Sequence, residues 1–87
     1  ETLDDFLRHL RAERGLSPHT VDAYRRDLAQ WTDDSGDLSP AAIEAWLGRL
    51  RTGGLKPASV ARKRAALSSY CRYLEDEGHL DRNPVRL

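Results

Sequence analysis

Four prolines divide this chain, and the residues around them constrain its fold more than any other feature. Pro18 and Pro40 each follow a serine, Pro57 follows a lysine, and Pro84 follows an asparagine near the end of the chain. Proline suits the first position of a helix, because its missing N–H is one that the first turn never uses. A serine before it can accept a hydrogen bond from the exposed amides. The sequence therefore predicts that helices begin at the first three prolines, whereas Pro84 marks an exit.

Apolar residues recur three and four positions apart through four segments, which is the spacing of an amphipathic helix. The predicted helices span about 3–14, 18–32, 40–51 and 57–77. The first is expected to be capped by Thr2, and glycines stand where the first, third and fourth should end. No segment alternates between polar and apolar residues as a strand does. The predicted fold class is all-α, a helical bundle with short loops.

Length and composition narrow the class of protein. The 87 residues suffice for one domain with one modest core. Cys71 is the single cysteine, which excludes an internal disulfide and fits a reducing, cytoplasmic compartment. No apolar run approaches the ~20 residues of a membrane span, so no membrane partner is expected. Because the chain opens at Glu1 without a methionine, we expect a piece excised from a longer protein.

The formal net charge is zero, but the charges are segregated along the chain. Residues 45–74 contain seven basic side chains and no acidic one, net +7, whereas residues 1–44 are net −5 and residues 75–87 are net −2. A charged partner would interact with the local charge of one segment rather than with the net charge of the whole chain. The seven basic residues are Arg49, Arg51, Lys56, Arg62, Lys63, Arg64 and Arg72.

The helix predicted at 57–77 has a buried stripe and a separate face with short side chains around an arginine. The stripe consists of Val60, Leu67, Cys71 and Leu74, and the other face of Ser59, Arg62, Ala66, Ser69 and Tyr73, with Lys63 and Arg64 flanking the stripe. Short side chains let a helix approach DNA closely, cations bind phosphates and guanine edges, and hydroxyls bind either. The alternative is an ordinary solvated basic helix.

Lys56 occupies the predicted cap position of that helix, yet it offers no side-chain acceptor. A cation at the positive end of a helix is unfavourable by ~0.3–1 kcal/mol. A phosphate bound by the free amides of Ala58 and Ser59, with Lys56 beside it, would reverse that sign. The position therefore favours an anionic partner.

The helix predicted at 18–32 offers a weaker second patch. Its outer face contains His19, Ala23, Arg26 and Gln30, and Thr20 lies in the first turn, where hydroxyls readily meet phosphate. Asp22 and Asp27 reduce the positive charge there, so an ordinary exposed face is the alternative.

No catalytic or metal site is predicted. The three histidines are too scattered to bind a metal, and Cys71 has no partner at ligand spacing. Tyr24, Tyr70 and Tyr73 are conceivable nucleophiles, but no neighbouring residue is arranged to activate them. No cofactor is expected.

Two stretches, FLRHLRAERGLSPHTVDAYRRDLAQW and GLKPASVARKRAALSSYCRYLEDEGHLDRNPVRL, closely resemble the N-terminal core-binding domain of tyrosine recombinases, the phage integrase and Xer-type family. The resemblance implies a SAM-like, orthogonal bundle of four or five helices that forms half of a C-shaped clamp around DNA. It also implies a core-binding domain over 1–82, and a linker from 83–87 to a missing C-terminal catalytic domain. The family's catalytic arginine, lysine, histidine and tyrosine belong to that absent domain, so none of the tyrosines here takes that role.

The same resemblance implies which residues contact DNA. They are His19, Thr20 and Arg26 on the second helix and Ser59, Arg62 and Lys63 on the fourth, with Lys56 at the start of the fourth. Three positions depart from the family's pattern. Arg64 stands where Leu is usual, and its guanidinium is expected to reach the rim. Ser68 stands where a basic residue is frequent, and Lys56 where Ser or Thr is common.

The function predicted is clamping of duplex DNA at a recombination site by a non-catalytic domain. Its expected partners are double-stranded DNA, the catalytic domain of the same polypeptide, and other recombinase protomers assembled on DNA. One alternative is a helical protein-interaction module whose basic face meets an acidic partner. A helix-turn-helix regulator fits less well, because it needs a short recognition helix after a turn of about three or four residues.

Overall fold

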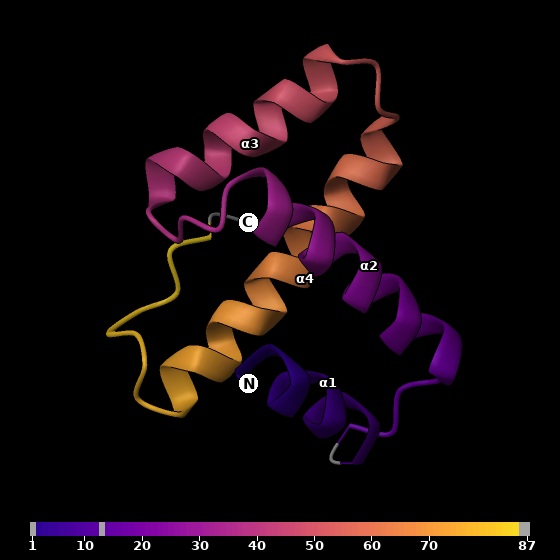
Figure 1. Ribbon diagram of the computed structural model, residues 1–87, viewed down its shortest axis with the longest axis vertical. Coiled ribbons are helices and arrows are strands. Elements are labelled where there is room, and N and C mark those ends of the chain that lie inside the picture. The colour runs from indigo at the N-terminus through magenta and orange to yellow at the C-terminus, as the bar shows by residue number, and fades with distance from the viewer. Residues whose placement is uncertain (1, 13, 86–87) are drawn as a thin grey trace.

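The described part of the chain folds into four helices, of which the second crosses the fourth (Figure 1). The structure, a computed structural model, describes residues 2–12 and 14–85. Its elements are α1 (Thr2–Ala12), α2 (Pro18–Asp34), α3 (Pro40–Thr52) and α4 (Pro57–Asp76), and the described ranges contain no strand. The all-α prediction is confirmed. Helix α1 begins at Thr2, which was predicted to cap it, and ends at Ala12 rather than near Arg14.

The three predicted proline starts are confirmed, and two have the predicted serine caps. Ser17 Oγ accepts a hydrogen bond from the amide of Thr20 at 3.2 Å, and Ser39 Oγ accepts one from Ala42 at 3.3 Å. Lys56 is the N-cap of α4 and makes no side-chain cap bond. Local rules thus set the starts of α2, α3 and α4.

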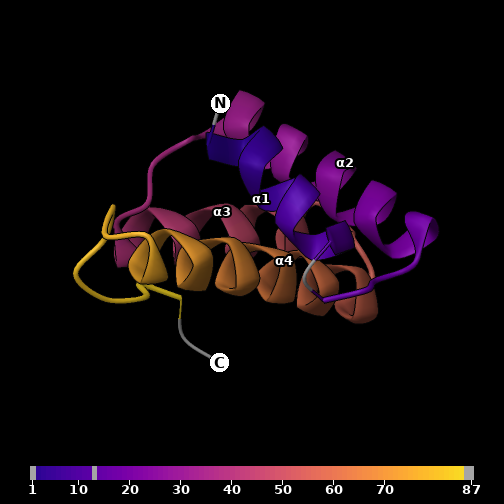
Figure 2. The same ribbon diagram turned by 90° about the horizontal axis from the view of Figure 1, so that it is seen from below.

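Helix α4 is the central element of the bundle and packs against α1, α2 and α3. Figure 2 shows α1 and α2 on one side of the molecule and α4 with α3 on the other. Helix α2 crosses over α4 (Figure 1), and Asp27 near the middle of α2 meets Arg62 in the first half of α4. This crossing determines which polar side chains of α2 and α4 come together.

The core gathers apolar residues from all four helices. Its largest fully buried side chains are Phe6, Leu10, Leu28, Ile43, Trp46, Leu47, Leu67 and Cys71. One expectation about the outer face of α4 was wrong, because Ala66, predicted on that face, is fully buried. Tyr73 of the same face is partly buried and packs against Phe6 and His9, with ring centroids 5.5 and 5.3 Å apart. No helix in the described ranges is long and apolar enough to cross a membrane.

Residues 83–85 return to the bundle after α4. Asn83 Nδ2 donates to the carbonyl of Ser68 at 3.0 Å, and its Oδ1 accepts from the amide of Val85 at 2.9 Å. Val85 is buried within the core cluster. The beginning of the predicted linker 83–87 therefore packs on the domain, whereas residues 86–87 lie outside the described residues.

Candidate nucleic-acid interface

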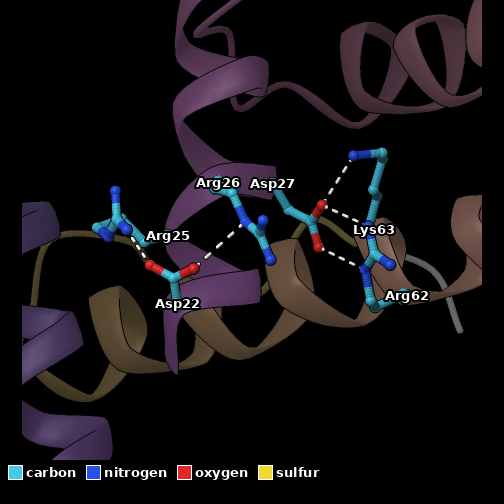
Figure 3. A network of polar contacts seen from close by, with 6 residues as sticks. All are labelled: Asp22, Arg25, Arg26, Asp27, Arg62 and Lys63. Atoms are coloured by element: carbon cyan, nitrogen blue, oxygen red, sulfur yellow. Dashed lines mark hydrogen bonds and ion pairs between the residues drawn. The ribbon is translucent and has the colours of Figure 1, made fainter. Parts of the chain in front are cut away.

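One buried carboxylate holds two cations where α2 crosses α4. Asp27 of α2 is only 3 % exposed. Its Oδ2 accepts from Arg62 Nε at 2.9 Å, and its Oδ1 accepts from Arg62 Nη2 at 2.9 Å and from Lys63 Nζ at 2.7 Å. Figure 3 shows both cations reaching from α4 to this one acid. The arginine contact is the two-pronged geometry that a guanidinium makes with a carboxylate.

The charges in this cluster determine its ionisation. Burial acts to raise the pKa of Asp27, but hydrogen bonds and charges from Arg62 and Lys63 outweigh it and hold that pKa below its usual value. The hydrogen bonds that Arg62 donates to Asp27, together with the charge of that carboxylate, in turn raise the pKa of Arg62. Counted as formal charges, one carboxylate and two cations give the cluster one net positive charge.

The two cations differ in what they offer to solvent. The Arg62 side chain is 49 % exposed, whereas that of Lys63 is 10 % exposed. Arg62 therefore lies at the surface, as expected for a DNA contact. Lys63 points inward and forms an ion pair with Asp27, although the sequence predicted that it flanks the buried stripe. A DNA contact by Lys63 stays a prediction.

Arg26 of α2 lies beside the same cluster. Its side chain is 70 % exposed and lies 3.5 Å from Asp22, which also pairs with Arg25 (Figure 3). A shallow depression is lined by Ala23, Arg26, Asp27, Gln30, Arg62 and Lys63. The fold thus brings together three predicted contact residues, Arg26 of α2 and Arg62 and Lys63 of α4. The two helices are joined here by Asp27 and Arg62, which are 35 positions apart in the sequence.

The other predicted residues lie at the starts of α2 and α4. His19 is exposed, and the partly buried Thr20 Oγ1 is 3.1 Å from Ser17 Oγ. Lys56 is exposed, and the structure gives it no ion pair among the described residues. One expectation was wrong. The amide of Ser59 is not free for a phosphate, since it donates to the Lys56 carbonyl at 3.0 Å.

Comparison with known proteins identifies the family to which this domain belongs. Residues 3–78 match the family described as "Phage integrase, N-terminal SAM-like domain". The chain belongs to this family. The predicted SAM-like bundle of a Xer-type recombinase is therefore confirmed, and no solved structure gives a significant match.

Curated relatives of this SAM-like domain are named "Tyrosine recombinase XerC". The protein of Chlorobaculum tepidum is 37 % identical over 98 % of this chain, and that of Chromohalobacter salexigens is 47 % identical over 82 %. The protein of Azotobacter vinelandii is 39 % identical over 95 %. The chain spans 30 %, 26 % and 30 % of their respective lengths, so it corresponds to one part of each relative.

A second group of polar residues beside α4 was missed as a site from the sequence. Arg14, in the loop before α2, donates from Nη1 to Ser69 Oγ at 3.0 Å. Arg14, Ser69 and the exposed Arg72 line two adjacent depressions. Ser69 and Arg72 are three positions apart on α4, so their shared side of the helix could have been predicted. The contact of Arg14 with Ser69 depends on the path of the loop before α2, and no sequence pattern indicates it.

Arg64, which departs from the family's usual leucine, connects α4 to α3. Its Nη1 donates to Glu44 Oε2 at 2.6 Å and its Nη2 to Oε1 at 3.0 Å. That hydrogen bonding raises the pKa of Arg64. Three of the seven cations in residues 45–74, namely Arg62, Lys63 and Arg64, are thus ion-paired with two acids from other helices. The positive block is therefore weaker in the fold than in the sequence.

The described residues contain no group of three or more histidine, cysteine or acidic side chains that could hold a metal ion. Tyr70 packs against Phe6 at a centroid distance of 5.2 Å, inside the core. Burial, with the charges of Glu77 and Asp5, raises the pKa of Tyr73. A raised pKa disfavours the phenolate that a nucleophilic tyrosine needs.

Proposed function

We propose that this chain is the DNA-binding, core-binding domain of a tyrosine-type site-specific recombinase, and that it clamps duplex DNA at the recombination site. The observation that supports this most is the shared depression in which Arg26 of α2 and Arg62 of α4 are both exposed. Two helices that present guanidinium groups side by side can bind neighbouring phosphates of one DNA backbone. The curated relatives are named tyrosine recombinases, which points to the same function.

The remaining predicted contacts extend this face along both helices. His19 and Thr20 lie at the start of α2, and Lys56 and Ser59 at the start of α4. Cations and hydroxyls at helix starts suit phosphate oxygens, because the positive end of the helix dipole adds to their attraction. Contacts of this kind position a protein on DNA more than they read its sequence.

For the whole protein, we propose that strand cleavage belongs to a separate C-terminal catalytic domain and that this chain is not catalytic. Its partners are duplex DNA, that catalytic domain and other protomers assembled on the DNA, in the cytoplasm. The isolated domain should bind weakly, with a dissociation constant of ~10⁻⁴–10⁻⁶ M. A second linked DNA-binding domain would raise the overall affinity without any new contact here.

Salt dependence of DNA binding tests the proposal. Arg26→Gln removes one exposed cation, so the slope of log affinity against log salt should fall by about 1. Arg8→Gln is the matched control, because Arg8 is equally an exposed arginine on a helix with an aspartate partner, Asp5. Fluorescence anisotropy of a labelled duplex measures both. An equal loss in Arg8→Gln would place the interface elsewhere and contradict the proposal.

A further inference from the structure

Asp27 is an acidic residue at the centre of a surface proposed to bind a polyanion. Considered by charge alone, it should weaken DNA binding. Yet it is almost completely buried, and both of its oxygens accept hydrogen bonds from cations of α4. Its carboxylate therefore faces Arg62 and Lys63 rather than solvent.

We propose that Asp27 is a positioning residue, which holds the Arg62 guanidinium in the orientation that binds a DNA phosphate. The proposal rests on the proposed function. Arg62 is tied through Nε and Nη2, which are two of the three nitrogens of its guanidinium. A planar guanidinium fixed at two nitrogens has little freedom left, so the remaining N–H groups point in one direction.

Those remaining donors are what a phosphate would use. A guanidinium has five N–H groups, of which Asp27 takes one from Nε and one from Nη2. Among the described residues, the structure gives Arg62 Nη1 no acceptor, and about half of the side chain is exposed (49 %). Two N–H groups of Nη1 and one of Nη2 can therefore bind an incoming anion while the contacts with Asp27 persist.

Lys63 makes this arrangement compatible with anion binding. A pair of Asp27 and Arg62 alone would be neutral, and its carboxylate would repel a phosphate. Lys63 Nζ, at 2.7 Å from Asp27 Oδ1, adds a second positive charge from a buried side chain. The group keeps one net positive charge, with Arg62 as its exposed member.

Two matched aspartate variants of α2 separate positioning from simple charge. Asp22→Asn and Asp27→Asn each remove one negative charge from the same helix. Asp22 is paired with the exposed Arg25 and Arg26, so its variant frees cations and should tighten binding by about twofold. In Asp27→Asn the side-chain amide keeps one acceptor oxygen in place of the two carboxylate oxygens, so Arg62 loses one of its two hydrogen bonds to residue 27. We expect binding of a labelled duplex to weaken about threefold to tenfold in this variant, because the side chain must then be ordered on binding.

The outcomes, measured by fluorescence anisotropy on the 87-residue chain at about 50 mM salt, are distinct. Weaker binding by Asp27→Asn together with tighter binding by Asp22→Asn supports the proposal. Binding by Asp27→Asn at least as tight as wild type overturns it and leaves the proposed function intact. Absence of binding by the wild-type chain overturns both.

A second comparison distinguishes positioning from a purely structural role. In an Arg62→Gln background, Asp27→Asn should weaken binding no further, whereas a structural role predicts the same loss in both backgrounds. If Asp27→Asn does not fold, Arg62→Lys takes its place, since lysine keeps the charge but cannot form the fork with Asp27. Binding by Arg62→Lys should also weaken about threefold to tenfold, and unchanged binding would overturn the proposal.

Discussion

Lys63 on α4 donates to Asp27 on α2 at 2.7 Å, across the crossing of the two helices and between residues 36 positions apart. Both side chains are buried, and Asp27 also binds the half-exposed Arg62. The contact joins the two helices that form the proposed DNA face. Asp27 and Lys63 thus contribute to the stability of the fold as well as to the charge of that face.

Replacement of Lys63 should destabilise the fold. Lys63→Ala removes a buried hydrogen bond to a charged group and leaves Asp27 with Arg62 alone, so we expect a loss of about 1.5–3 kcal/mol in the free energy of unfolding. Urea unfolding measures this, with Lys56→Ala as the exposed control within about 0.5 kcal/mol of wild type. A loss as small as the control's would show that the buried pair contributes little. DNA affinities of Lys63 variants must therefore be measured under conditions where the chain is folded.

The same ion pairs predict how stability depends on pH. The folded-state pKa of Asp27 is lowered, so its contribution is fully present above the unfolded-state pKa of about 3.9 and is lost as the pH falls through the folded-state value. Wild type should be more stable than Asp27→Asn at pH 7, and the difference should shrink as the pH falls below about 4. Urea unfolding of both proteins between neutral and acid pH measures it. A difference that stays constant across this range would contradict the assignment.

Lys56 should lower the stability of the fold while it raises the affinity for DNA. Its backbone, at φ −62° and ψ 145°, closely matches the serine caps Ser17 and Ser39. Lys56→Ser should therefore form a third serine cap before a proline and raise the free energy of unfolding by about 1 kcal/mol. DNA affinity should fall at the same time, because a cation beside the start of α4 is lost. Thermal unfolding and anisotropy titration test the two effects, and tighter DNA binding by Lys56→Ser would contradict the role of Lys56.

Cys71 provides an internal measure of unfolding. The thiol is fully buried, and burial raises its pKa to about 11. Because the thiolate is the reactive form, the folded chain should resist alkylation by iodoacetamide at neutral pH, while the urea-unfolded chain should react rapidly. Mass spectrometry follows the reaction. Rapid alkylation of the folded chain would contradict the packing of Cys71 in the core.

What could be predicted from the sequence differs with the range of the interaction. The starts of α2, α3 and α4 depend on adjacent residues such as Ser17 and Ser39, so local rules were sufficient. The partners of Lys63 and Arg64 lie 36 and 20 positions away, and no local pattern specifies them. The burial of Ala66 likewise depends on how other helices cross α4. The sequence therefore indicated the positive block correctly but overstated how much of it remains uncompensated.

Whether the crossing of α2 and α4 binds DNA can be tested directly by titrating the isotopically labelled chain with duplex DNA and recording NMR spectra of the backbone amides at about 50 mM salt. We expect shifts concentrated in the first half of α2 and the first half of α4, around Arg26 and Arg62. The outer face of α1, around Arg8, should remain unchanged. Absence of shifts, or shifts that are largest around Arg8, would contradict the claim that the crossing of α2 and α4 forms a DNA-binding face.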